Sequence, residues 1–229
     1  MERNIKIILI VALLLIAAGL FFFGNNNFSQ EPQYQTLANN STGTVEKCVY
    51  GNDNAETSIA LITGIHPREK LSIEPVIKAA KEYNKGSVKI IHYKVTVTDN
   101  PEDYDIGRAN GENLIHDHVN PDVVKSDADA VIISHSHMAG YGEGFYLATP
   151  EMDNASVQIA KKVNETSDFN YYPVVGNETY KSTSAVLVSK PIAQAGYPTF
   201  VYEIPEDVTN DTATSKTMEL FGMISDIIS

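Results

Sequence analysis

The chain has 229 residues, with 17 Lys and Arg against 29 Asp and Glu and a formal charge of −12. This length suits one domain, or one domain with an appendage. The acidic balance argues against nucleic acid as a partner, because phosphates are bound by clustered Lys and Arg side chains. The single cysteine, Cys48, excludes an intrachain disulfide and a cysteine-rich metal site.

Residues 1–24 predict a membrane anchor. Residues 7–23 form an uncharged, apolar run behind Arg3 and Lys6, and such a run can cross a bilayer with its positive flank in the cytoplasm. The alternative is a cleaved signal peptide, whose apolar core is usually about 7–15 residues long. We therefore expect a single-pass protein of the cell membrane with its domain outside the cytoplasm, or a secreted protein if the signal is cleaved.

Residues 25–44 predict a flexible polar stalk, because Asn, Gln, Ser and Thr dominate there and large apolar residues are few. Acceptor triplets for N-glycosylation agree with export. They begin at Asn27, Asn39, Asn40, Asn154, Asn164, Asn177 and Asn210. The globular domain is then expected over residues 45–229.

From residue 45 onward, short β-branched runs alternate with helical periods. The patterns predict strands at 57–63, 88–97, 128–134 and 199–202, and helices at 71–83, 155–163, 184–195 and 214–228. This alternation is typical of an open α/β sheet, mostly parallel or mixed, with helices on both faces. Ligands of such sheets bind beyond the carboxyl ends of the strands. Polar residues that directly follow a strand are therefore the first candidates for a site.

Three polar groups follow predicted strands in this way: His66 with Glu69, then His135, then Glu203. An imidazole and a carboxylate three residues apart can bind one metal ion together. A catalytic zinc site needs three protein ligands and one open position for water. His135 is the natural third ligand, because it would reach the same sheet edge from a neighbouring strand.

The phrases TGIHPREKLSIEP, VIISHSH and PTFVYEIPE together resemble the zinc carboxypeptidase superfamily, in particular its succinylglutamate desuccinylase and aspartoacylase branch. The resemblance covers residues 57–206, and the three motifs stand in the family order. It implies a zinc carboxypeptidase-like fold in which Zn²⁺ is bound by His66, Glu69 and His135. It also implies that Glu203 is the catalytic carboxylate, which takes the proton of the attacking water and returns it to the leaving nitrogen.

The resemblance implies two further catalytic residues. Arg108 follows an Asn-Pro pair, as does the family arginine that stabilises the negative charge on the attacked carbonyl oxygen. Tyr180 stands before Glu203 at about the place where carboxypeptidase-like members have a mobile tyrosine over the substrate.

The sequence departs from the family at the residues that bind a terminal carboxylate. The family usually has an Asn-Arg pair there, whereas Asn113 is followed by Leu114. Without this arginine fork, we expect an endopeptidase, amidase or deacylase rather than a strict carboxypeptidase. Arg68 is the candidate replacement charge, and His116 is a second candidate for substrate binding at the rim of the site.

Other histidines leave alternatives open. His137 could replace His135 as the ligand or support it, because the two lie one residue apart on an extended segment. His116 and His118 could form a separate metal site, although polar loop residues are the simpler interpretation. His92 is expected to be an exposed strand residue, and Cys48 a small buried one.

The sequence thus predicts a membrane-anchored, extracytoplasmic zinc hydrolase that cleaves an amide bond in a peptide or acylated amine, with the cell envelope as the source of substrate. The alternative is a non-catalytic surface module of the same fold that binds envelope peptides or sugars. The oligomeric state is not indicated by the sequence.

Overall fold

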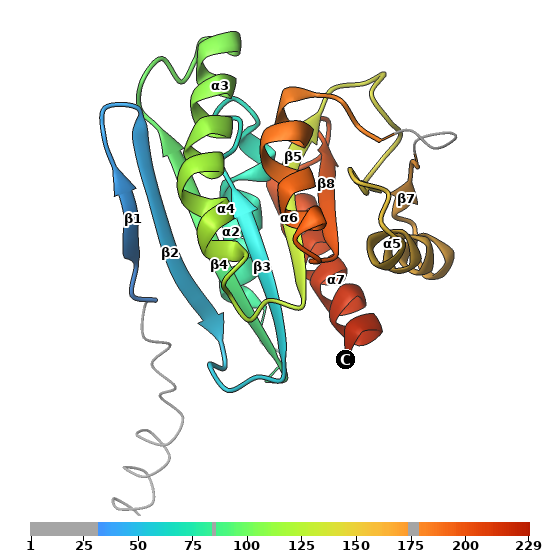
Figure 1. Cartoon of the computed structure of the whole chain (residues 1–229). Coiled ribbons are helices and arrows are strands. Elements are labelled where there is room, and N and C mark those ends of the chain that lie inside the picture. Colours follow the sequence, from blue (N-terminus) through green and yellow to red (C-terminus); the bar gives the residue numbers. More distant parts are fainter. Residues whose placement is uncertain (1–31, 84–85, 174–178) are drawn as a thin grey trace, which may run out of the picture. The chain divides into compact units, whose positions relative to one another are not determined.

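The computed structural model describes residues 32–83, 86–173 and 179–229 (Figure 1). The domain runs from Gln33 to Ser229. The predicted anchor and residues 25–31 of the predicted stalk lie outside the described residues. Within the part that is described, no helix combines the length and the apolar character needed to cross a membrane.

The described residues form one eight-stranded sheet in the order β1-β2-β4-β3-β5-β8-β6-β7. The four central strands, β4, β3, β5 and β8, are parallel, while β1, β2 and β6 join by antiparallel pairing. The expected mixed sheet with a parallel centre is therefore confirmed. The strands are β1 Gln35–Asn39, β2 Gly43–Gly51, β3 Thr57–Thr63, β4 Val88–Val97, β5 Ala130–His137, β6 Tyr146–Ala148, β7 Asn170–Tyr171 and β8 Thr199–Pro205.

Helices cover both faces of the sheet (Figure 1). Successive side chains of a strand point to opposite faces, and every residue of β3 is buried. Ile59 and Leu61 pack with α2 (Glu74–Glu82), α5 (Asn154–Thr166) and α7 (Asn210–Ile228). On the other face, Ala60 and Ile62 belong to an apolar cluster with residues of α3, α4, α6 and two π-helical turns. These elements are α3 Tyr104–Leu114, α4 Asn120–Val123, α6 Lys190–Gln194 and the π-helical turns Ile115–Val119 and Ala185–Ser189.

The sequence patterns located most elements but missed some. The strands β3 and β4 have the predicted bounds, whereas β5 extends to His137. The predicted helix 71–83 is divided into a short 3₁₀ turn, Lys70–Ser72, and α2. Helix α3 was not predicted, because Gly107 and Gly111 interrupt its pattern and glycine disfavours a helix.

The N-terminal boundary of the domain also needs correction. Residues 35–44, which the composition assigned to the stalk, form β1 and the start of β2. β1 is an edge strand that pairs only with β2 among the described strands. Leu37 and Ala38 pack against the α3-side cluster, and the other residues of β1 are exposed and polar. A polar composition is therefore compatible with a strand at the sheet edge.

The interpretation of His92 as an exposed residue is wrong. Its side chain is completely buried, because β4 is an inner strand with helices over both faces. Nε2 lies 2.9 Å from the hydroxyl of Thr63, and Nδ1 lies 3.8 Å from the sulfur of Cys48. Burial lowers the pKa of His92 to about 3, so the ring is neutral at ordinary pH. The burial predicted for Cys48 is confirmed.

A proline explains the second π-helical turn. Pro191 follows Ala185–Ser189 by two residues. A proline inside a helix lacks an N–H donor and its ring clashes with the carbonyl four residues earlier, here that of Leu187. The Leu187 oxygen instead accepts hydrogen bonds from Nδ1 of His116 and Nδ2 of Asn120, each at 3.0 Å. The turn is thus anchored by the facing helical segment.

Candidate metal centre

The loop after β3 is held in place by two close backbone contacts. Gly64 has a φ angle of +84°, and a Cβ atom there would lie 2.0 Å from the carbonyl oxygen of Val95. A Cβ atom on Gly111 of α3 would lie 1.9 Å from the carbonyl oxygen of Ile65. Only glycine allows such approaches. Strand β4 and helix α3 therefore fix the loop that presents His66.

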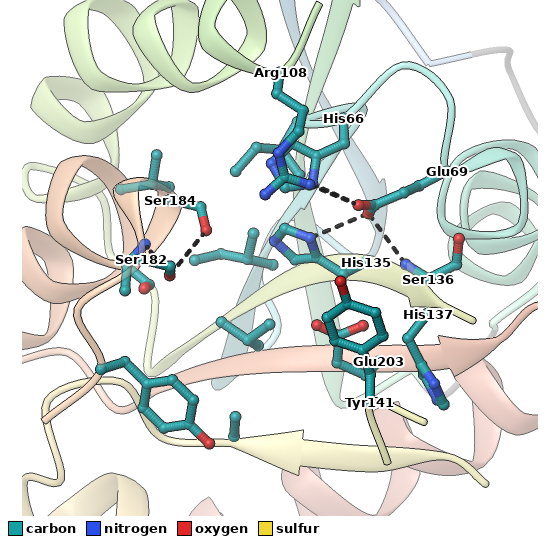
Figure 2. Close-up of a pocket in the computed structure, with 18 of the residues that line it drawn as sticks. His66, Glu69, Arg108, His135, Ser136, His137, Tyr141, Ser182, Ser184 and Glu203 are labelled. Carbon is teal, nitrogen blue, oxygen red and sulfur yellow. Dashed lines mark hydrogen bonds and ion pairs between the residues drawn. The ribbon is translucent and has the colours of Figure 1, made fainter. Parts of the chain in front are cut away.

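His66, Glu69 and His135 converge at the carboxyl end of the central strands (Figure 2). Nδ1 of His66 lies 2.6 Å from Oε1 of Glu69, and Nδ1 of His135 lies 3.1 Å from Oε2. One ligand atom from each of the three side chains lies within 4.8 Å of the other two. The predicted triad is therefore brought together, although its motifs are far apart in sequence.

The surroundings of the triad suit a divalent cation. Nε2 of His66 donates to Oε1 of Glu112 at 3.2 Å, so Glu112 holds the imidazole ring in its orientation. The backbone N–H of Ser136 donates to the other carboxylate oxygen of Glu69 at 3.1 Å. Two imidazole nitrogens and a carboxylate held at one point are a typical donor set for zinc.

Glu112 was missed by the sequence reasoning. It lies four residues after Arg108 on α3, and both side chains reach the triad from the same helix face. This spacing could have indicated it, but only if the helix itself had been predicted.

Burial and charge act in opposite directions on the acidic residues of the site. Burial raises the pKa of Glu69, but the charge of His135 and hydrogen bonds from His135 and His66 outweigh it and hold the pKa well below the ordinary value. Burial raises the pKa of Glu203, and the negative charge of Glu69 adds to this effect. The pKa values of the two carboxyl groups are thus shifted in opposite directions. Glu69 is suited to bind a cation and Glu203 to exchange a proton.

Glu203 lies directly beside the triad. In the register of β5 and β8, His135 is paired with Glu203. Both line a cavity of about 620 Å³. This volume lies within the range of small-molecule sites, about 300–1,000 Å³. It is large enough to enclose part of a peptide.

The predicted arginines also line the cavity. Nη1 of Arg108 lies 3.1 Å from Nδ1 of His66 and 3.5 Å from Oε1 of Glu69. Arg68 is exposed, and its guanidinium and that of Arg108 lie over the ring of Tyr104 at 5.8 and 5.3 Å. The positive charge of these two arginines is therefore gathered on the α3 side of the cavity.

Tyr180 lines the same cavity. Its hydroxyl donates to the carbonyl oxygen of Tyr172 at 2.9 Å.

His116 does not reach the cavity, since its ring is hydrogen-bonded to the Leu187 carbonyl oxygen as described above. The ring of His137 contacts the backbone of Met138 and Gly144, and His135 alone of the two joins the triad. A further residue that sequence reasoning missed is Glu206, which lines the cavity and accepts a hydrogen bond from the Ser136 hydroxyl at 3.2 Å.

Comparison with solved structures identifies the fold. A metallo-carboxypeptidase from Burkholderia cenocepacia is similar with a TM-score of 0.53 and 12% sequence identity, over 91% of this chain and 69% of that one. The tripeptide-bound cell shape determinant Csd4 from Helicobacter pylori gives a TM-score of 0.55 and 12% identity, over 80% of this chain and 55% of that one. By sequence, no family model and no curated protein matches the chain.

The chain therefore has a metallo-carboxypeptidase-like fold, as its three motifs predicted. It spans about two thirds of the first of these proteins and about half of the second. The comparisons do not separate the desuccinylase and aspartoacylase branch from the others.

Proposed function

We propose that this protein is a zinc-dependent hydrolase that cleaves an amide bond in a peptide or acylated amine of the cell envelope. The observation that carries the proposal is the convergence of His66, Glu69 and His135 in one cavity with Glu203. The metallo-carboxypeptidase fold supports it. The tripeptide bound to the cell shape determinant supports a peptide as substrate. The location outside the cytoplasm rests on the sequence of residues 1–24 alone.

Zinc held by His66, Glu69 and His135 would supply a Lewis acid and lower the pKa of water in the site. Glu203, with its raised pKa, accepts a proton from the attacking water and returns it to the leaving nitrogen. Arg108 lies close enough to the triad to stabilise negative charge that develops on the carbonyl oxygen. Glu112 keeps the ring of His66 in its orientation.

The test uses the full-length protein with one equivalent of zinc. Acylated amino acids and short envelope-type peptides are screened for release of a new amine. We expect Glu203→Gln to lower the turnover of any substrate found by about 10²–10⁴-fold, while zinc remains bound. Glu165→Gln, on the exposed surface of α5, is the matched control and should keep full activity.

Two results would contradict the proposal. One is wild-type protein that holds less than about half an equivalent of zinc after reconstitution, because the site requires one ion. The other is turnover that survives Glu203→Gln. Peptide binding without any turnover in the wild type would favour the non-catalytic module instead.

A further inference from the structure

The cavity contains one acidic side chain that the proposed mechanism does not use. Its lining includes three carboxylates, those of Glu69, Glu203 and Glu206. Glu69 belongs to the metal triad and Glu203 is the proposed base, whereas Glu206 has no part in the reaction steps above. A carboxylate in the wall of a substrate cavity is a candidate partner for a cationic group of the substrate.

Hydrogen bonds to β5 place Glu206 beside the triad. Its backbone N–H donates to the carbonyl oxygen of His137 at 3.0 Å, and its Oε1 accepts from the hydroxyl of Ser136 at 3.2 Å. The backbone N–H of Ser136 in turn donates to Oε2 of Glu69 at 3.1 Å. Ser136 thus contacts the metal triad with its backbone and Glu206 with its side chain, so the carboxylate of Glu206 lies close to the reacting atoms.

The negative charge of Glu206 is not balanced within the part of the chain that the structure describes. Its one described side-chain contact is the neutral hydroxyl of Ser136, and it forms no ion pair there. The acidic residue on α3, in contrast, has a basic neighbour, since Nη2 of Arg108 lies 3.8 Å from Oε1 of Glu112. The exposed carboxylate of Glu206 is therefore available to a ligand.

The arginines of the cavity lie on a different side. Among the described lining residues these are Arg68 and Arg108, and no lysine is present. Both guanidinium groups lie over Tyr104 of α3, and Arg68 belongs to the loop after β3. In the sheet order, β5 separates β3 from β8, and Glu206 directly follows β8. The cavity is therefore positive towards α3 and negative towards the end of β8, where a cation is favoured.

An exposed aromatic ring lies on the same side as Glu206. His137 closes the loop 138–144, because its two ring nitrogens lie 3.2 and 3.0 Å from the carbonyl oxygens of the first and last residues of this loop. Tyr141 in the loop is 72% exposed and lines the cavity. Figure 2 shows it on the side of His137. The face of an aromatic ring attracts cations, so Tyr141 and Glu206 favour the same kind of ligand.

We propose that Glu206, together with the ring of Tyr141, is the subsite for an ammonium group of the substrate, such as the side chain of a lysine. This inference rests on the proposed function, because it concerns the same cavity. A substrate carboxylate at this position would be repelled by Glu206, and an apolar group would displace water from a charge without pairing it. The chain charge of −12 adds a long-range attraction for cationic substrates.

The test compares blocked tripeptides in which one residue, Xaa, is Lys, norleucine or Glu. Norleucine has an apolar chain without the ammonium group, and Glu reverses the charge. Xaa is placed in turn at each position, in acetyl-Xaa-Ala-Ala-amide, acetyl-Ala-Xaa-Ala-amide and acetyl-Ala-Ala-Xaa-amide. For the zinc-loaded, full-length protein, we expect one position at which kcat/KM is about tenfold higher for Lys than for norleucine, and lower still for Glu.

Variants then assign this preference to the subsite. Glu206→Gln should reduce the Lys-to-norleucine ratio to about one, and Glu206→Lys should make the Glu peptide a better substrate than the Lys peptide. Tyr141→Leu should lower the ratio about two- to fivefold. Asp207→Asn is the matched control, because Asp207 is an exposed acidic residue next to Glu206 that does not line the cavity. Its ratio should stay within about twofold of wild type.

Two kinds of result would overturn the inference. One is a wild-type protein that does not prefer Lys at any position. The other is Glu206→Gln that leaves the Lys-to-norleucine ratio unchanged because all peptides are slowed equally, as a structural role would require, or that changes it no more than Asp207→Asn does. A preference caused by charge should also weaken between about 0.1 M and about 1 M salt, because the Debye length falls from about 10 to about 3 Å.

A binding measurement separates this inference from the proposed function. Calorimetry on zinc-loaded Glu203→Gln, with and without Glu206→Gln, gives the Kd of the Lys and norleucine peptides. If wild type cleaves none of the peptides, the proposed function fails for peptides. Tighter binding of the Lys peptide that Glu206→Gln removes would still support the subsite, and equal binding of the two peptides would overturn it.

Discussion

Gly111→Ala tests whether contact between α3 and the loop after β3 builds the site. The new Cβ atom would lie 1.9 Å from the carbonyl oxygen of Ile65, whereas ordinary contact begins at 3.4 Å. The helix or the loop must therefore move by about 1.5 Å. Because both partners are backbone, no side-chain rotation relieves the clash.

The expected loss follows from two opposing effects. Overpacking a well-packed site costs up to about 3 kcal/mol, and alanine returns about 1 kcal/mol through its better helix propensity. The net loss is about 2 kcal/mol, which lowers the unfolding temperature of a domain of this size by about 4–8 °C. The same movement breaks the 3.2 Å hydrogen bond between His66 and Glu112. We expect zinc affinity to fall about 10–100-fold as a result.

The assay is thermal unfolding of the zinc-free protein, followed by zinc titration against a competing chelator. Gly86→Ala is the control, because a Cβ atom there meets nothing within 4 Å, and it should change stability by less than about 0.5 kcal/mol. If Gly111→Ala behaved like Gly86→Ala in both measurements, the contact would not be what positions the metal loop.

Three further predictions concern single ionisable groups. Glu112→Gln removes the charge beside His66, so zinc affinity should fall about 10–100-fold in a chelator competition; unchanged affinity would exclude this role. His92 has a pKa of about 3 in the folded protein, whereas an unfolded chain takes up this proton near pH 6.5. The free energy of unfolding should therefore fall as the pH drops from about 6.5 towards 3, by about 1.4 kcal/mol per pH unit. It is measured by urea unfolding at each pH, and a pH dependence that is no weaker in His92→Leu would refute the assignment. Because Glu203 must be ionised to act as a base and burial raises its pKa, kcat/KM should rise with pH through a midpoint above the ordinary glutamate value of about 4.3. A pH–rate profile with its acid midpoint at or below that value speaks against Glu203 as the base.

The sequence alone determined the parallel centre of the sheet and the residues of the triad. Apolar runs such as 57–63 are buried on both faces, which makes them strands whatever surrounds them. His66 with Glu69 and His135 could be assigned because each lies at or just beyond the carboxyl end of such a strand, and parallel strands end at one edge of the sheet. Their chemistry depends on residue type and on a position at the end of an apolar run, both of which local sequence expresses.

Only the tertiary structure decided which other side chains reach the site. Helix α3 brings Glu112 to His66, and the second π-helical turn brings Ser189 to the wall of the cavity. No local pattern marks either residue. His116 looked like a site residue and instead anchors that turn through Leu187. The physical reason is that contacts between residues far apart in sequence depend on how helices pack and where a proline widens one of them. A strand-end ligand, in contrast, is marked by its residue type and by the apolar run before it.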